Sequence, residues 1–267
     1  MHAHGRPRAR RSWLALAGVA AAVAIVCAVG LTRPSTATTP PVVAAVDAAP
    51  PATVPLALPQ HPTVLVFGDS WVYGSAATEP TLGFAYVAAE KLGWNAIVDG
   101  VRGSGYLKPG YDGPAYGERI AALDPSLDPD LVIVEGSIND RRLYPGGYES
   151  AVTSAWDDLA ALYPDAQIVV LGPAPQILPV EKETAQIDAD LASFAAERGW
   201  LYISPIEQEW ITDANYGSVI DTSELGNDHP STEGHAYLAS RLDEALTALS
   251  GASTIVADAP VDDVGVR

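Results

Sequence analysis

The stretch TVLVFGDSW, residues 63–71, decides the fold class of this chain. A nearly unbroken apolar run leads into Gly68, and Asp69 and Ser70 follow at once. A continuous apolar run of this length is typical of a strand buried on both faces of a parallel sheet, because a half-exposed strand would alternate. Ser70 is therefore expected at the carboxyl end of a buried strand, as a nucleophile or as a helix cap.

Four further apolar runs follow the same pattern, and amphipathic stretches separate them. The runs cover residues 95–100, 130–136, 166–172 and 201–204. Helical spacing of apolar residues occurs within 84–92, 152–163, 187–194 and 238–249, with Gly199 ending the third helix and Ser231 or Thr232 capping the last. This alternation predicts an α/β fold, a three-layer α/β/α sandwich around a central, mostly parallel five-stranded sheet.

The two ends of the chain differ in character from the middle. Residues 1–12 are basic, and residues 13–31 carry no charge and are long enough for a helix that crosses a bilayer. We expect a membrane-spanning signal-anchor, or a signal peptide cut near Ala37 or Ala44, and both export the rest of the chain. Residues 32–60 read as a Pro/Ala/Thr-rich linker, residues 61–250 as the folded domain, and residues 251–267 as an acidic, disordered tail.

Charge and cysteine content exclude several kinds of function. Residues 61–267 hold 10 Lys and Arg against 32 Asp and Glu, a formal charge of −22. Binding to nucleic acid needs clustered cations, so a nucleic-acid partner is excluded. Cys27 is the sole cysteine, so no disulfide forms within one chain.

Three strands end in polar, glycine-containing turns that a parallel sheet would bring to one edge. Ser70, Gly103 and Asn139 lie in these turns. A serine nucleophile needs a base, usually histidine, and His229 lies in a polar loop before the last helix. His235 is expected to pack within that helix, and His61 lies at the linker edge. The backbone N–H groups of Ser70 and Gly103 and the amide of Asn139 are candidate oxyanion donors, although each residue also suits a turn or a cap.

The ordered set of blocks FGDS, VRGSG, GSIND and a late HP resembles the SGNH hydrolase family, which contains the GDSL esterases and lipases. The resemblance covers about residues 63–250. It implies a flavodoxin-like sandwich and a reaction that hydrolyses esters without a metal or an organic cofactor. It also implies that Ser70 is the nucleophile, that His229 is the base, and that Ser70, Gly103 and Asn139 form the oxyanion hole.

One position departs from the pattern of this family. The residue three places before the catalytic histidine, an aspartate in the family, is Gly226 here. We expect Asp228, directly before His229, to orient the imidazole. Glu224, Asp221 and a backbone carbonyl, which would leave a Ser-His dyad, are the alternatives.

Together these features predict an extracytoplasmic serine esterase that acts on O-acyl groups of glycans or on lipid or aryl esters. A non-catalytic domain that binds envelope polysaccharide, and an O-acyltransferase that uses the same Ser-His pair, are the alternatives. Four aromatic residues beside the motif blocks are expected either to contact substrate or to complete the core. They are Trp71, Tyr73, Tyr106 and Tyr144.

Overall fold

The computed structural model describes residues 51–251. The expected basic N-terminus, the apolar segment 13–31, the linker up to residue 50 and the tail from residue 252 lie outside the described residues. Within residues 51–251, no helix has the length and apolar character needed to cross a bilayer.

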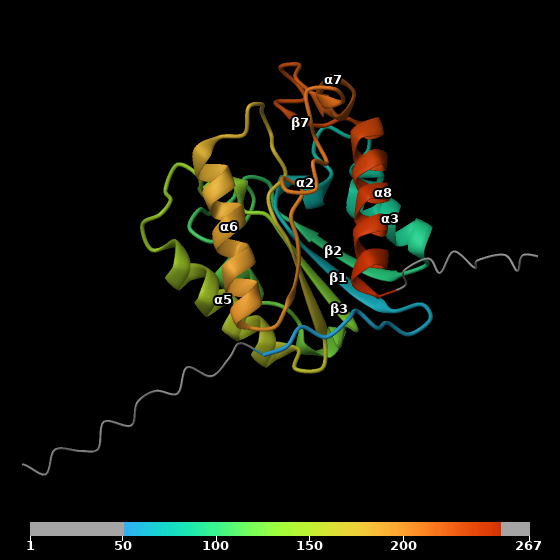
Figure 1. The fold of residues 1–267 in the computed structure, drawn as a ribbon, viewed down its shortest axis with the longest axis vertical. Helices are drawn as coiled ribbons and strands as arrows, with labels where there is room; N and C mark the ends of the chain where they lie inside the picture. Colours follow the sequence, from blue (N-terminus) through green and yellow to red (C-terminus); the bar gives the residue numbers. More distant parts are fainter. Residues whose placement is uncertain (1–50, 252–267) are drawn as a thin grey trace, which may run out of the picture. The chain divides into compact units, whose positions relative to one another are not determined.

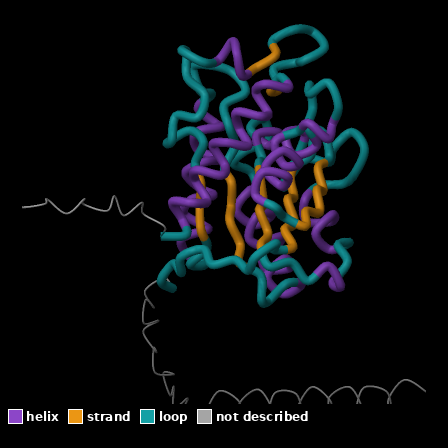
Figure 2. Tube along the Cα trace, turned by 90° about the vertical axis from the view of Figure 1, so that its right-hand side faces the viewer, coloured by secondary structure: helices purple, strands orange, loops and turns teal. Residues whose placement is uncertain are grey.

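A five-stranded sheet, in which every strand is parallel to its neighbours, forms the centre of the domain (Figure 2). The strand order is β2-β1-β3-β4-β5. The strands are β1 (Thr63–Gly68), β2 (Asn95–Gly100), β3 (Leu131–Glu135), β4 (Gln167–Leu171) and β5 (Leu201–Ile203). The predicted parallel sheet is confirmed, and its strands lie within one or two residues of the expected runs.

Helices cover both faces of the sheet (Figure 1). One layer contains α3 (Phe84–Leu92) and α8 (Thr232–Leu249), and the other contains α4 (Tyr116–Ala121), α5 (Tyr148–Leu162) and α6 (Lys182–Glu197). The shorter elements are α2 (Ser70–Tyr73), α7 (Tyr216–Val219), the 3₁₀ turns η1 (Pro80–Leu82), η2 (Pro125–Leu127) and η3 (Ile138–Asp140), and an antiparallel pair β6 (Ile220–Asp221) and β7 (His229–Pro230). The predicted three-layer sandwich is confirmed.

The sequence of β1 is apolar without alternation because both faces of the strand are buried. Val64 and Val66 belong to the core beneath α3 and α8, whereas Leu65 and Phe67 belong to the core beneath α4, α5 and α6. Successive side chains of a strand point to opposite faces, and here both faces are covered by helices. All four side chains are therefore buried.

Helix ends follow the sequence signals in part. The Ser231 hydroxyl accepts a hydrogen bond from the Gly234 backbone N–H at 3.0 Å, which confirms Ser231 as the cap of α8. Helix α4 was not expected, because it spans six residues and no side chain caps its N-terminus. A helix this short gives little periodic signal in the sequence.

Residues 51–60 differ from the extended linker that the sequence suggested. They form no helix or strand, but Leu56 is only 6% exposed and joins the core beneath α8. The Leu56 N–H donates to the Leu249 carbonyl at 3.0 Å, and the Ala57 N–H donates to Gln167 Oε1 at 2.8 Å. The folded unit therefore begins before residue 61.

This packing predicts that Leu56→Ala lowers the free energy of unfolding by about 2–4 kcal/mol, because it removes buried methyl groups and leaves a cavity. The matched control is Val54→Ala, at a side chain that is 65% exposed, and its effect is expected to stay within about 0.5 kcal/mol. Urea unfolding of both variants measures the difference. Equal effects would mean that residues 51–60 contribute nothing to the core.

Candidate active site

A tight turn between β1 and α2 presents Ser70 at the sheet edge. Asp69 is the N-cap of α2, and its carboxylate accepts a hydrogen bond from the Trp71 N–H at 2.9 Å. Gly68 is required at this turn, because an added Cβ would lie 2.5 Å from Glu135 Oε2 and 2.6 Å from a methyl group of Val72. The close packing around this glycine fixes the direction in which Ser70 leaves the strand.

His229 reaches Ser70 from a distant part of the chain. It lies in β7, whose pairing with β6 anchors the loop between residues 221 and 229. The distance from His229 Nε2 to Ser70 Oγ is 2.9 Å. A serine hydroxyl at this distance from an imidazole has the base that it needs to act as a nucleophile.

Two backbone carbonyls hold the other side of the imidazole. His229 Nδ1 lies 3.1 Å from the Gly226 oxygen and 2.9 Å from the Asn227 oxygen. Because carbonyl oxygens only accept hydrogen bonds, Nδ1 carries the hydrogen and Nε2 is left as the acceptor that faces Ser70. The backbone takes positive φ at Asn227 and Asp228, a conformation that Asn and Asp tolerate better than most residues.

The structure does not show the expected hydrogen bond between the Asp228 carboxylate and the His229 imidazole. In residues 51–251 the Asp228 carboxylate makes no hydrogen bond with the imidazole, and both partners of Nδ1 are main-chain oxygens. Asp221 instead accepts from the Ser223 N–H at 2.9 Å. The Ser223 hydroxyl and N–H together lower the pKa of Asp221, and Glu224 is exposed. Of the alternatives, the structure matches the dyad held by backbone carbonyls.

This arrangement predicts that Asp228→Asn keeps kcat/KM for a neutral ester within about threefold of the parent protein, because the two carbonyls still fix the tautomer. Loss of an aspartate that orients a catalytic histidine costs about 10⁴-fold in kcat. Steady-state hydrolysis of p-nitrophenyl acetate measures the change, with His229→Gln as the inactive reference. A drop of the larger size would restore Asp228 as the orienting acid.

The three candidate oxyanion donors lie around the same cleft as His229. The backbone N–H groups of Ser70 and Gly103 donate no hydrogen bond to any residue between 51 and 251. The Asn139 amide nitrogen is already engaged, with Asp69 Oδ2 at 2.8 Å and the Ser104 carbonyl at 3.0 Å. Two N–H groups are therefore free for a ligand oxygen, and the third donor is held in position by two acceptors.

Two further residues shape this edge and were missed in the sequence. Asp140 accepts hydrogen bonds from three successive backbone N–H groups, of residues 106–108, and so fixes the loop that carries Gly103. Arg119 is buried and donates to the Gly68 carbonyl at 2.8 Å and to Ser104 Oγ at 2.9 Å. The position of Asp140 directly after Asn139 in the GSIND block could have identified it as a site residue. Arg119 lies in α4, the helix that the sequence did not predict.

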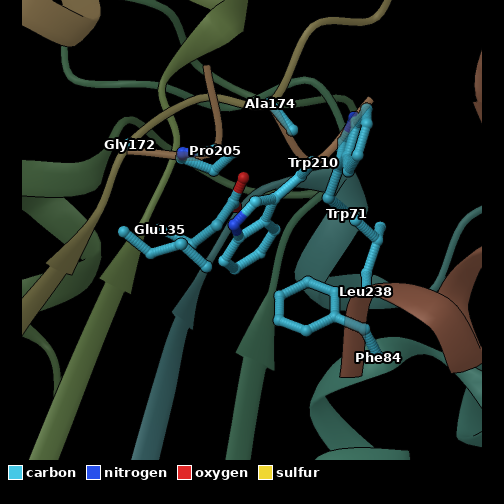
Figure 3. Close-up of a pocket in the computed structure, with 9 residues that line it drawn as sticks. Trp71, Phe84, Glu135, Gly172, Ala174, Pro205, Trp210 and Leu238 are labelled. Atoms are coloured by element: carbon cyan, nitrogen blue, oxygen red, sulfur yellow. The ribbon is translucent and has the colours of Figure 1, made fainter. Parts of the chain in front are cut away.

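Asp69 and Glu135 form a buried acidic pair behind Ser70. The Asp69 backbone N–H donates to Glu135 Oε2 at 3.3 Å, and Glu135 faces a cavity of about 10 Å³, room for about one water molecule (Figure 3). Burial raises the pKa of Asp69 to about 6. Burial, together with the charge of Asp69, raises the pKa of Glu135 well above its usual range.

The raised pKa of Glu135 predicts a pH-dependent effect of Glu135→Gln on stability. Between the pKa of Glu135 in the unfolded chain and its higher pKa in the folded protein, the folded state keeps a proton that the unfolded state releases. The contribution of Glu135 to the free energy of unfolding therefore falls as the pH rises from the first of these pKa values towards the second. Glutamine does not titrate. The variant should therefore gain stability relative to the parent between pH 5 and pH 8, as urea unfolding measures.

Glu149→Gln, at an exposed position of α5, is the matched control and should show no such gain. If the two variants respond to pH in the same way, Glu135 is not a neutral buried acid.

The other residues that the sequence singled out lie in the core or along the cleft. His235 is buried, with Nδ1 accepting from the Phe84 N–H at 3.2 Å, and burial lowers its pKa to about 4. Trp71 and Tyr106 are core residues, as the packing alternative proposed. Tyr73 lines the cleft, and the Tyr144 hydroxyl binds Asp190 at 2.8 Å.

The fold and the facing Ser70 and His229 side chains define an SGNH-type hydrolase. The family model described as GDSL-like Lipase/Acylhydrolase matches residues 66–237, more than half of the chain. The chain is also 30% identical, over 67% of its own length and 79% of the relative, to a GDSL lipase of Mycobacterium tuberculosis. This chain belongs to the GDSL-like lipase/acylhydrolase family, and it is a carboxylic ester hydrolase.

Solved structures show the same fold at lower identity. An aryl esterase of M. smegmatis is 19% identical, with a TM-score of 0.52 and coverage of 70% of this chain and 99% of that one. A carbohydrate esterase family 2 enzyme of Corynascus, which carries an additional carbohydrate-binding domain, is 20% identical, with a TM-score of 0.53 and coverage of 74% and 69%. At such identities the likeness concerns the fold, and it does not select a substrate.

Proposed function

We propose that this chain is an extracytoplasmic serine esterase in which Ser70 and His229 hydrolyse esters through an acyl-enzyme. The 2.9 Å contact between Ser70 Oγ and His229 Nε2 is the observation that carries the proposal. The uncharged segment 13–31, preceded by arginines, supports placement of the domain outside the cytoplasm.

The reaction follows from the protonation state of the imidazole. As Ser70 Oγ attacks the ester carbonyl carbon, Nε2 of His229 takes the hydroxyl proton and then gives it to the departing alcohol. A water molecule next attacks the acyl-enzyme and passes a proton to Nε2. Ser70 Oγ recovers that proton when the carboxylic acid leaves, so the enzyme returns to its starting state.

The negative charge that develops on the carbonyl oxygen needs donors in fixed positions. The N–H groups of Ser70 and Gly103 are unengaged within the described chain, and Asn139 supplies an amide beside them. Because Asp69 and the Ser104 carbonyl hold this amide, its donation to substrate requires that one of these bonds be shared or exchanged. The bonds that hold it fix its position before substrate arrives.

The cleft supports an O-acyl group on a glycan as the first candidate substrate. It has a volume of about 680 Å³, and it is open to solvent at Tyr73 and Tyr111, which are 37% and 80% exposed. Exposed tyrosines suit contact with a sugar, because the apolar face of the tyrosine ring packs against the sugar ring while the tyrosine hydroxyl stays in contact with water. Lipid and aryl esters are the next candidates.

Ser70→Ala should lower kcat for p-nitrophenyl acetate by about 10⁴-fold or more, because the nucleophile is lost while the fold is kept. The matched control is Ser126→Ala in the 3₁₀ turn η2, which should leave kcat unchanged. Full activity in Ser70→Ala would overturn the assignment. Binding of acetylated glycan without turnover by the parent protein would instead favour the non-catalytic alternative.

A further inference from the structure

Four cations line the active-site cleft of a strongly acidic domain. They are Arg102, Lys108, Arg141 and Arg142. Residues 51–251 contain nine Lys and Arg against 29 Asp and Glu, so nearly half of the described cations gather at one site. A random distribution of nine cations would not be expected to concentrate them around the nucleophile.

Two of these cations are neutralised by neighbours. Arg102 pairs with Asp112 at 2.6 Å, and Arg141 pairs with Glu181 at 2.6 Å. Asp228 is the other acid that lines the cleft besides Glu181. The guanidinium of Arg102 also lies 5.1 Å from the centre of the Tyr73 ring, so it orders the aromatic wall of the cleft.

The other two cations are free to meet a ligand. Within residues 51–251, neither Lys108 nor Arg142 forms an ion pair with a protein carboxylate. The Lys108 ammonium lies 5.7 Å from the centre of the exposed Tyr111 ring. Arg142 is exposed and lies two residues after Asp140, the last residue of η3. Both cations line the same cleft as the candidate oxyanion donors.

Local charge decides which ligand such a cleft favours. At physiological ionic strength, charges on an exposed surface are screened beyond about 8 Å, so the acids of the outer surface contribute little inside the cleft. Unpaired cations at a concave site raise the local concentration of anions by a factor of about 10 or more. Of the three Lys and Arg side chains in residues 51–251 without an ion pair, Lys108 and Arg142 line the cleft, and Lys182 lies in α6. An acidic enzyme with two unpaired cations at its active site would select an anionic substrate there.

The surroundings also limit the acyl group. The apolar cavity next to Trp71 and Glu135 has a volume of about 10 Å³, room for about one water molecule, so it offers no space for a long acyl chain (Figure 3). Among the apolar side chains that line the larger cleft, Ile177 and Leu225 are exposed at 39% and 96%. These features suit a short acyl group on a polar alcohol.

We propose that the cleft takes a short-chain O-acyl carbohydrate that carries a carboxylate or phosphate near the ester, with Lys108 and Arg142 binding the anion. This inference rests on the esterase function proposed above and names its substrate class. Tyr73 and Tyr111 contact the sugar ring, and the ester carbonyl lies at Ser70.

The test compares acetate release from three matched methyl glucosides acetylated at O2, O3 and O4. One carries the C6 carboxylate, one a 6-phosphate, and one the uncharged C6 amide. We expect kcat/KM for at least one anionic sugar to exceed that for the amide by about tenfold at physiological ionic strength, and the ratio to fall as the salt concentration is raised further. The carboxylate and phosphate arms identify which anion is preferred.

The double variant Lys108→Gln, Arg142→Gln should bring the ratio of anionic to neutral kcat/KM close to one. The control is Lys91→Gln, which removes one cation at the end of α3, where it pairs with Asp243 at 2.9 Å outside the cleft. It should keep the preference.

The inference and the proposed function fail in different ways. Turnover of p-nitrophenyl acetate with no preference for an anionic sugar overturns the inference alone, and so does a preference that survives in the double variant. Absence of turnover with every ester, including p-nitrophenyl acetate, overturns the esterase proposal and the inference that rests on it.

Discussion

The contact between Ser70 Oγ and His229 Nε2 is the constraint on which the account of this molecule depends. The two residues are 159 positions apart, and the fold brings them to 2.9 Å. Ser70 is fixed because β1 is buried on both faces and turns sharply at Gly68 into α2. His229 is fixed because the short β6–β7 pair and the cap of α8 hold its loop at the same edge of the sheet.

A connected set of polar groups supports the turn that carries Ser70. Asp69 caps α2 and accepts from the Asn139 amide, the same amide donates to the Ser104 carbonyl, and Arg119 joins Ser104 to the end of β1. Buried polar groups are costly unless they are paired, so such a network favours one arrangement over others. Glu135 completes it as a neutral acid, since its burial beside Asp69 disfavours a second charge.

Much of this was readable from the sequence, because the determining features are local. The continuous apolar runs gave the parallel strands, and the polar residues directly after three of them marked the site. The partners of His229 could not be read in this way: they are backbone carbonyls, brought into place by positive φ at Asn227 and Asp228. The packing of Leu56 and the gathering of cations around the cleft both depend on tertiary structure. The net negative charge of the domain gave no sign that four of its cations line one cleft.

Covalent labelling with a fluorophosphonate tests the central claim most directly, because this reagent reacts with a serine only when a neighbouring base activates it. After digestion, mass spectrometry should find one phosphonylated peptide, containing Ser70, and the rate of its formation should fall sharply in His229→Gln. Labelling at another serine, or labelling of Ser70 at the same rate without His229, would contradict the Ser70–His229 pair as the catalytic unit.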